Sequence, residues 1–218
     1  MSDPLDSLYP FLAGTAMNRD TLLDDLATSA QSKARASMRL RRDTLAALDN
    51  EITAVAIEMA KRFRRHAHFF TFGNGGSSSD AASVATLFSR PPWGLPLPTR
   101  CLVDDVAVLT AVSNDVGFEL AFARQIIAHG KPGDIALAIS TSGDSRNLLI
   151  ALREAASRQI LTIGLVGYQG GALAAASIDH CLIVRSDSVH RIQESQAAVG
   201  FKLWLAVQEV LASGDSGA

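Results

Sequence analysis

Short apolar runs alternate with longer amphipathic segments from about residue 66 onward. The runs predict buried strands at 68–72, 99–103, 135–139, 161–166 and 181–184, and the segments predict helices at 81–89, 106–112, 118–129, 147–153 and 191–211. Strands that alternate with helices at this spacing imply crossover connections and a parallel sheet covered on both faces. The pattern therefore predicts an α/β fold built on five parallel strands.

Ahead of the first strand, the segment 20–65 contains neither Gly nor Pro. Apolar residues at steps of three and four from Leu45 to Phe63 predict one amphipathic helix, and those from Leu22 to Ala30 predict another, with a break near 41–43. Because a minimal sheet does not need two such helices, we expect residues 1–65 to form a helical extension that packs against another subunit. Within it, 1–18 is expected to be irregular, and 213–218 is expected to be a disordered tail.

A turn rich in hydroxyl groups lies between the strand 135–139 and the helix 147–153; it carries Ser140, Thr141, Ser142 and Ser145. The start of a helix has unpaired backbone N–H groups and partial positive charge, so it suits a phosphate dianion, and hydroxyl groups add further donors. Alternatively, Ser142 or Ser145 only caps the helix. Capping needs one hydroxyl and this turn has four, so phosphate binding is favoured. The chain has no GxxxxGK[ST] motif, which argues against a nucleotide P-loop.

A second turn, Gly73-Asn74-Gly75-Gly76-Ser77, follows the strand 68–72. Alone, it could serve only to make a tight bend. Both turns stand at the carboxyl ends of their strands, however, and parallel sheets bind ligands beyond that edge, where the strand order reverses. We therefore expect the two turns to face one crevice.

Composition narrows the possible partners and the location. A net charge of -2 gives no general attraction to nucleic acid or to anionic membranes. Basic clusters at 39–42 and 61–65 have acidic neighbours and no interleaved aromatic residues, which favours a solvated helix face over direct nucleic-acid binding. The start lacks the pattern of a secretory leader and no segment is apolar enough for a membrane span, so a cytoplasmic location is expected. Cys101 and Cys181 lie in apolar strands without metal-site spacing, which favours buried free thiols over a disulfide or a metal role.

The two turns and three further motifs resemble those of the SIS (sugar isomerase) domain family, within it the sedoheptulose-7-phosphate (phosphoheptose) isomerase group. The matching stretches are GNGGSSSDA at 73–81, SNDVGF at 113–118, GDIALAISTSGDSRN at 133–147, GYQGG at 167–171 and RIQE at 191–194. Their order and spacing match over about residues 40–211. The resemblance implies a flavodoxin-like three-layer fold with the SIS domain at 66–212, a sugar phosphate as ligand, and a homotetramer with sites at subunit interfaces.

The same resemblance assigns binding roles to individual residues. It implies phosphate contacts from the hydroxyl side chains, a place near the sugar for two polar side chains, and further contacts from the glycine turn and the last helix. These residues are, in that order, Ser77, Ser140, Thr141, Ser142 and Ser145; Asn74 and Asp115; and Gly75 and Gln193.

The chain departs from the group at the metal ligands. The group's metal-dependent isomerases resemble one another in a His and a Glu four residues apart on the helix after GNGGS and in two His residues after RIQE. The equivalent positions here are Ser83, Leu87, Gln196 and Phe201. Leu and Phe cannot ligate a metal, and Ser and Gln are poor substitutes for imidazole. We therefore expect neither a zinc site of the usual kind nor any other cofactor.

An aldose-ketose isomerase still needs a base beside the carbonyl carbon and an acid for the oxygens. Glu194 and His190 are the candidates, although Glu194 could instead form a helix-face salt bridge and His190 could be an exposed residue at a helix start; His180 is expected to be structural. Two functions remain open. One is isomerisation of a C7 ketose phosphate or a related sugar phosphate without zinc. The other is an inactive sugar-phosphate sensor or tetrameric adaptor, like the relatives that bind replication-initiation proteins.

Overall fold

The computed structural model describes residues 19–214. The irregular segment expected at 1–18 and positions 215–218 of the expected tail lie outside these residues. Ser213 and Gly214, the first two positions of that tail, belong to the last helix.

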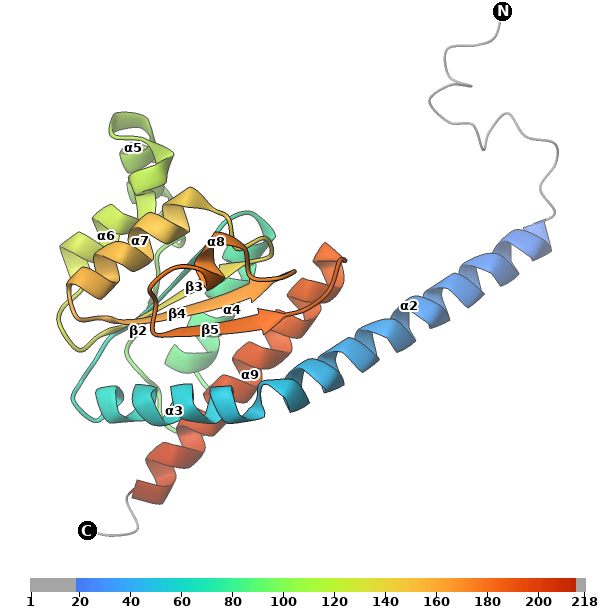
Figure 1. Cartoon of the computed structure of the whole chain (residues 1–218), viewed down its shortest axis with the longest axis horizontal. Helices are drawn as coiled ribbons and strands as arrows, with labels where there is room; N and C mark the ends of the chain where they lie inside the picture. Colours follow the sequence, from blue (N-terminus) through green and yellow to red (C-terminus); the bar gives the residue numbers. More distant parts are fainter. Residues whose placement is uncertain (1–18, 215–218) are drawn as a thin grey trace, which may run out of the picture. The chain divides into compact units, whose positions relative to one another are not determined.

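Five strands form a single parallel sheet (Figure 1) in the order β2-β1-β3-β4-β5. The strands are β1 Phe69–Gly73, β2 Thr99–Cys101, β3 Ile135–Ser140, β4 Leu161–Gly167 and β5 His180–Val184. The five-stranded parallel sheet is thus confirmed. Because β2 lies on one side of β1 and β4 on the far side of β3, the strand order reverses between β1 and β3. The two expected ligand-binding turns follow these two strands.

Helices cover both faces of the sheet, which makes three layers (Figure 1). Alternate residues of β3 point to opposite faces, so Ile135, Leu137 and Ile139 belong to one apolar cluster and Ala136 and Ala138 to another. The first cluster packs against α3 Asp49–Phe63, α4 Gly76–Ser89 and α9 Val189–Gly214. The second packs against α6 Ala121–His129, α7 Arg146–Ser157 and the short α8 Gly171–Ala174, a helix that the sequence pattern did not predict.

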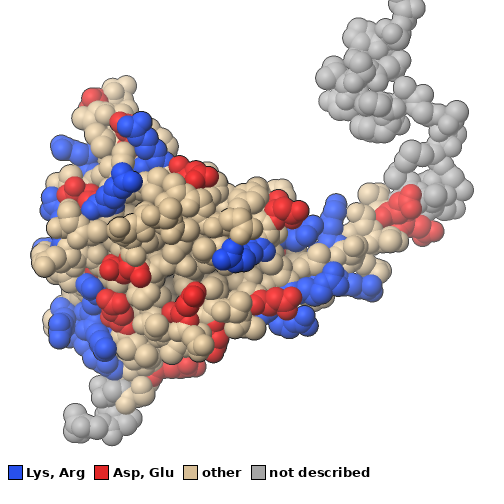
Figure 2. Space-filling model, in the orientation of Figure 1, with Lys and Arg blue, Asp and Glu red and all other residues tan. Residues whose placement is uncertain are grey.

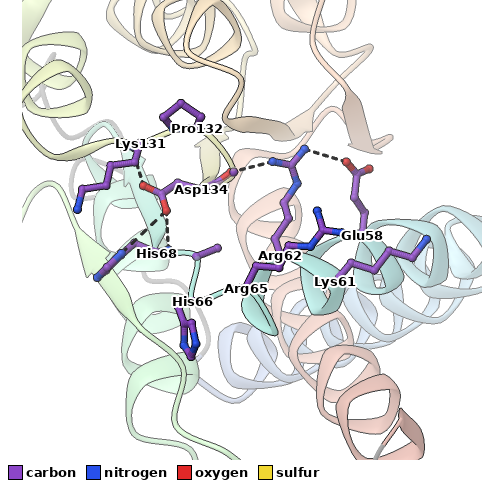
Figure 3. Close-up of a pocket in the computed structure, with 11 residues that line it drawn as sticks. Glu58, Lys61, Arg62, Arg65, His66, His68, Lys131, Pro132 and Asp134 are labelled. Atoms are coloured by element: carbon purple, nitrogen blue, oxygen red, sulfur yellow. Dashed lines mark hydrogen bonds and ion pairs between the residues drawn. The ribbon is translucent and has the colours of Figure 1, made fainter.

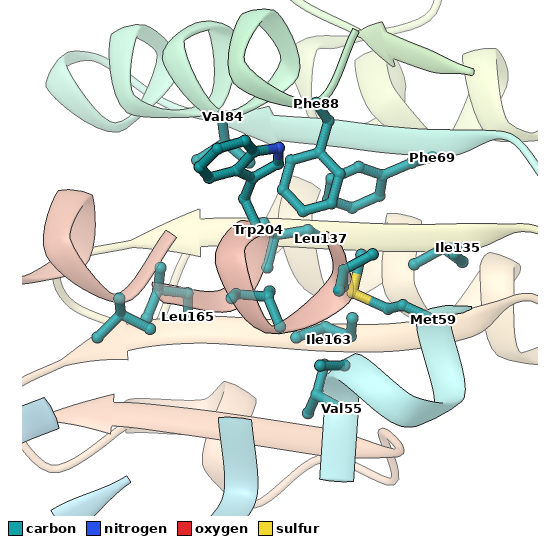
Figure 4. Packing of buried hydrophobic residues seen from close by; sticks show 14 of the residues in the cluster. Val55, Met59, Phe69, Val84, Phe88, Ile135, Leu137, Ile163, Leu165 and Trp204 are labelled. Atoms are coloured by element: carbon teal, nitrogen blue, oxygen red, sulfur yellow. The ribbon is translucent and has the colours of Figure 1, made fainter. Parts of the chain in front are cut away.

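Large side chains fill the first cluster (Figure 4). Trp204 of α9 and Met59 of α3 are fully buried in it, and the rings of Phe69 and Phe88 lie 4.9 Å apart between their centroids. Burying each such side chain is worth about 1.5–3 kcal/mol. This packing fixes the positions of α4 and α9, the two helices whose first turns line the depression at the candidate site.

The α-helix that follows β2 has no buried residue. This is α5 Val106–Asp115, which Asp105 caps by accepting a 3.0 Å hydrogen bond from the backbone N–H of Val108. The helix expected at 118–129 is divided into a 3₁₀ turn, η1 Phe118–Leu120, and α6. Val106 and Phe118 are exposed, so apolar surface is concentrated around α5.

The N-terminal helix α2 spans Arg19–Ala47, and the break expected near 41–43 is wrong. The interruption is at Leu48 instead, directly before α3. Helix-type hydrogen bonds from Leu48 N–H to the Thr44 carbonyl (3.0 Å) and from Ile52 N–H to the Leu48 carbonyl (2.8 Å) continue across it. No Gly or Pro is needed for so slight a break, which is why the sequence did not reveal it.

Three other expectations concern single residues or the membrane. Cys101 is buried and Cys181 half-buried, both are free thiols, and burial raises the pKa of each. His180 Nε2 lies 3.0 Å from Glu58 Oε2, which agrees with a structural role. Over the described residues 19–214, no helix has the length and apolar character needed to cross a bilayer.

Candidate functional site

The two ligand-binding turns meet at the strand-order reversal. Asn74, after β1, and Asn147, in the first turn of α7, exchange two amide hydrogen bonds of 2.8 and 2.9 Å. The Asn147 side-chain oxygen also accepts a 3.0 Å bond from the backbone N–H of Leu148. These bonds hold the loop after β1 against the start of the helix after β3, so the two turns lie side by side.

The segment 140–145, which we call the hydroxyl loop, is shaped by its own side chains. Ser140 Oγ accepts from the Gly143 N–H at 3.0 Å, and Ser142 Oγ accepts from the Asp144 N–H at 3.2 Å. Gly143 has φ +75°, and a Cβ there would collide with the carbonyl oxygen of Gly170 in the loop after β4. Glycine alone fits such a position without strain. A third strand-end loop therefore supports the hydroxyl loop from behind.

Several donors of this loop remain available for a ligand. Ser145 precedes the first residue of α7, yet its side chain makes no capping hydrogen bond. The hydroxyl groups of Thr141 and Ser145 and the backbone N–H groups of Arg146 and Asn147 donate to no other residue in the described part of the chain. Unpaired N–H groups and hydroxyls at a helix start are the donors that bind a phosphate. The structure does not support the capping interpretation for Ser145.

A shallow depression of about 470 Å³ adjoins the glycine turn. Its walls come from the start of α4 and the first turns of α9; the lining residues are Gly76, Ser79, Asp80, His190, Gln193, Glu194 and Ala197. A Cβ on Gly76 would collide with the Gln193 amide nitrogen, so α9 approaches the turn closely. The structure thus brings together Gln193, Glu194 and His190.

Glu194 and His190, the two acid/base candidates, each had a structural alternative, and the structure bears differently on the two. Glu194 forms no ion pair with any residue of the described chain, so the salt-bridge interpretation has no support. His190 is exposed in the first turn of α9, as the alternative expected, and it also lines the depression. Their catalytic roles stay predictions.

Asp80 is a further candidate that sequence reasoning missed. It projects from α4, and Gln193 Nε2 lies 3.5 Å from its Oδ2. Burial raises the pKa of this carboxyl group, and the hydrogen bond from Gln193 opposes only part of that rise. A raised pKa makes its carboxylate a stronger base than that of an exposed aspartate. The sequence did contain a signal for Asp80, because this residue lies four positions after Gly76 and therefore one helical turn from the glycine turn.

The four positions equivalent to metal ligands have other roles in packing. Ser83 Oγ donates to the Ser79 carbonyl at 2.8 Å, and Leu87 packs against the core. The buried Gln196 donates to the carbonyls of Ser140 (2.9 Å) and Leu165 (3.1 Å). Phe201 stacks beside Trp204, with ring centroids 5.3 Å apart. Ser83 and Gln196 are thus bonded to the protein's own backbone, and Leu87 and Phe201 contact core side chains.

Of the remaining predicted binding residues, Ser77 and Gly75 lie at the glycine turn, whereas Asp115 has no bond to either turn. Ser77 is buried at the start of α4, next to the glycine turn that contains Gly75. Asp115 ends α5, where it accepts a 2.9 Å hydrogen bond from Asn114. No hydrogen bond or ion pair between residues 19 and 214 connects Asp115 to either turn, so its place near the sugar stays a prediction.

Comparison with known proteins agrees with this geometry. A family profile described as SIS domain matches residues 14–167. The phosphoheptose isomerase of Roseiflexus sp. is 38% identical over 180 residues, which cover 81% of this chain and 90% of the relative. The chain belongs to the SIS domain family.

Within this family, the similarity to phosphoheptose isomerases extends to solved structures. That of Francisella tularensis has a TM-score of 0.79 and 33% identity, covering 84% of this chain and 98% of its own. The phosphoheptose isomerase of Neisseria gonorrhoeae also has a TM-score of 0.79, with 29% identity and coverage of 84% and 99%. This is therefore a phosphoheptose isomerase-like SIS protein.

Proposed function

We propose that the protein binds a sugar phosphate, with the phosphate in the hydroxyl loop and the sugar extending toward the depression between α4 and α9. The hydrogen-bonded pair Asn74–Asn147 carries this proposal, because it places the unpaired donors of the hydroxyl loop beside the glycine turn. Hydroxyl and backbone N–H donors recognise phosphate through charge-assisted hydrogen bonds. The relatives, which are phosphoheptose isomerases, point to a heptose phosphate.

The activity proposed is interconversion of a C7 ketose phosphate and its aldose. In this reaction a base removes a proton from the carbon next to the carbonyl, and an acid protonates the carbonyl oxygen to give an enediol. A proton is then returned to the former carbonyl carbon, and the hydroxyl on the neighbouring carbon loses its proton, which moves the carbonyl to that carbon. Glu194 and Asp80 supply carboxylates for the carbon-bound proton, and His190 is the candidate for exchanging a proton with the oxygens.

The proposed reaction proceeds without zinc. Support comes from the donor chemistry at the equivalent positions, where Leu87 and Phe201 have no ligand atom and the Gln196 amide donates to two backbone carbonyls. All proton transfers are therefore assigned to side chains of the depression.

The test is to incubate the protein with sedoheptulose 7-phosphate, with and without added zinc, and to follow conversion by NMR. Turnover should be independent of zinc and should fall by about 10²-fold or more in Glu194→Gln if Glu194 is the base. A parallel Asp80→Asn variant shows which carboxylate removes the proton. Turnover that both variants retain would refute the acid/base assignment.

A sensor or adaptor remains the second candidate function. It is favoured by the same replaced metal positions, because a binding protein needs the hydroxyl loop but not a set of ligands for catalysis. Absence of turnover, together with a higher melting temperature in the presence of sugar phosphate, would establish the sensor.

We further propose that the chain forms a homo-oligomer, a tetramer by resemblance. The supporting observation is that α2 and α5 each carry large apolar side chains exposed to solvent. Leu23 and Leu26 of α2 are exposed, as are Val106 and Val108 of α5. Size-exclusion chromatography with light scattering tests this, and a monomer at micromolar concentration would contradict it.

A further inference from the structure

A second cavity lies at the amino ends of β1 and β3, at the opposite end of these strands from the two ligand-binding turns. It has a volume of about 550 Å³, within the usual range for small-molecule sites. Three segments enclose it (Figure 3): the end of α3, the turn before β1, and the turn before β3. The six residues of β3 lie between this cavity and the hydroxyl loop. At about 3.3 Å per residue, the two sites are roughly 20 Å apart.

Hydrogen bonds hold the walls of the cavity in place. The carboxylate of Asp134, before β3, accepts from the backbone N–H groups of His68 (2.7 Å) and Lys131 (2.8 Å). Arg62 of α3 donates to Glu58 at 3.1 Å and reaches the Asp134 carbonyl at 3.4 Å. The three segments are therefore connected before any ligand arrives.

The residues that line the cavity carry unbalanced charge. Four cationic side chains and two carboxylates line it; the cations are Lys61, Arg62, Arg65 and Lys131. Both carboxylates are already hydrogen-bonded within the wall: that of Asp134 to backbone N–H groups, and that of Glu58 to Arg62 and His180. Although partial burial raises the pKa of Glu58, these two partners outweigh it and leave the pKa below its ordinary value. Glu58 is therefore a stable anion paired with Arg62.

Three of the cations are left for a ligand. Across the described chain, no carboxylate lies within ion-pair distance of the side-chain nitrogens of Lys61, Arg65 or Lys131. The neighbouring Arg64 differs, because it donates to the Val210 carbonyl at 2.6 Å and does not line the cavity. Figure 2 shows basic side chains gathered over this end of α3, at the lower left of the view.

The backbone at the cavity also holds a histidine in an unfavourable conformation. His66 follows α3 with φ 62°, and its N–H bonds to the Phe63 carbonyl (2.9 Å) while that of Ala67 bonds to the Arg62 carbonyl (3.2 Å). This is a Schellman motif, whose left-handed position is usually glycine. Its hydrogen bonds engage carbonyls at the helix end that would otherwise repel an anion.

We propose that this cavity binds a small molecule that carries two or more phosphate groups. A single phosphate would engage only part of a set of three unpaired cations that come from two separate segments. A chain of linked phosphates can contact Lys61 and Arg65 on one side and Lys131 on the other. A nucleoside triphosphate and an inorganic polyphosphate share this chemistry.

The test is isothermal titration of the full chain with sodium tripolyphosphate and, separately, with ATP at near-physiological salt. Both should bind saturably, more weakly as salt is raised, and inorganic phosphate should bind at least about tenfold more weakly. Tighter binding of ATP than of tripolyphosphate would identify a nucleotide as the source, and equal affinity a free polyphosphate chain. Failure of both to bind at millimolar concentration would overturn the proposal.

Matched variants locate the site. Lys61→Gln/Lys131→Gln should weaken tripolyphosphate binding at least about tenfold, because two contacts to charged groups are lost. Arg124→Gln/Arg153→Gln removes the same charge from exposed positions on α6 and α7 and should have no effect. Equal losses in the two variants would show attraction to overall charge and would refute the site.

Competition distinguishes binding in this cavity from binding at the hydroxyl loop. Saturating sedoheptulose 7-phosphate should leave tripolyphosphate binding unchanged, whether or not the protein proves to be an isomerase. Displacement of tripolyphosphate by the sugar phosphate would place the polyanion in the hydroxyl loop and would overturn the proposal.

Discussion

Removing the side chain of Asn147 tests the connection between the two turns. The Asn147→Ala substitution deletes both amide bonds to Asn74 and the bond from the Leu148 N–H. Each hydrogen bond contributes about 0.5–1.5 kcal/mol. Asn147 is only 4% exposed, so its lost bonds inside the protein are not fully replaced by water. Asn74 is half-exposed and can turn to solvent. Three such bonds sum to about 1.5–4.5 kcal/mol. Because Asn74 can bond to water instead, we expect the free energy of unfolding to fall by about 2 kcal/mol, in the lower half of this range.

The assay is urea unfolding followed by tryptophan fluorescence, which reports the buried Trp204 and the neighbouring Trp93. Protein concentration is held fixed because assembly would add stability. A double-mutant cycle with Asn74→Ala should give a coupling energy of about 1–2 kcal/mol. Asn114→Ala is the matched control, since that exposed side chain bonds only to the adjacent Asp115. Its loss should cost less than about 0.5 kcal/mol. Additive effects of Asn74→Ala and Asn147→Ala would refute the idea that this pair joins the turns.

Three further substitutions have defined outcomes. Gly143→Ala places a Cβ against the Gly170 carbonyl at a residue whose φ is +75°. It should destabilise the protein by about 2 kcal/mol or more in thermal unfolding, and unchanged stability would contradict the loop geometry. Gln159 has φ 60° in a second Schellman motif. Gln159→Gly should therefore stabilise the protein by about 1 kcal/mol, and a lower melting temperature would contradict this. The raised pKa of Asp80 means that its contribution to stability falls as pH rises from the ordinary value of 3.8 through the folded-state pKa. Asp80→Asn should therefore raise the melting temperature at pH 7 and have no such effect below that window; the opposite pH dependence would refute the burial argument.

The positions of the strands and of the two turns along the chain could be predicted because their signals are local. Apolar runs of four to six residues marked the strands, and hydroxyl or glycine clusters marked the turns at the ends of two of them. The convergence of those turns also followed from the general behaviour of parallel sheets. The hydrogen bonds that hold the turns together could not be predicted. Asn74 and Asn147 are 73 residues apart, and neither local sequence indicates that the two side chains are in contact.

Other features depended on tertiary packing. Asp80 was visible as part of a motif, but its raised pKa depends on burial beside Gln193 of α9, which only the fold brings near. The basic cluster at 61–65 was expected to be a solvated helix face. Part of it instead lines a cavity with Lys131, a residue far along the chain whose approach the sequence could not show.

Binding of sedoheptulose 7-phosphate to a hydroxyl-loop variant tests the account most directly. Thr141→Val/Ser145→Ala removes the two hydroxyl groups of the hydroxyl loop that have no partner within residues 19–214, and Ser157→Ala, at the far end of α7, is the control. By isothermal titration the double variant should bind about 100-fold more weakly than the parent, the loss expected for two hydrogen bonds to a charged group. Parent-like affinity in the folded double variant would contradict the placement of the phosphate.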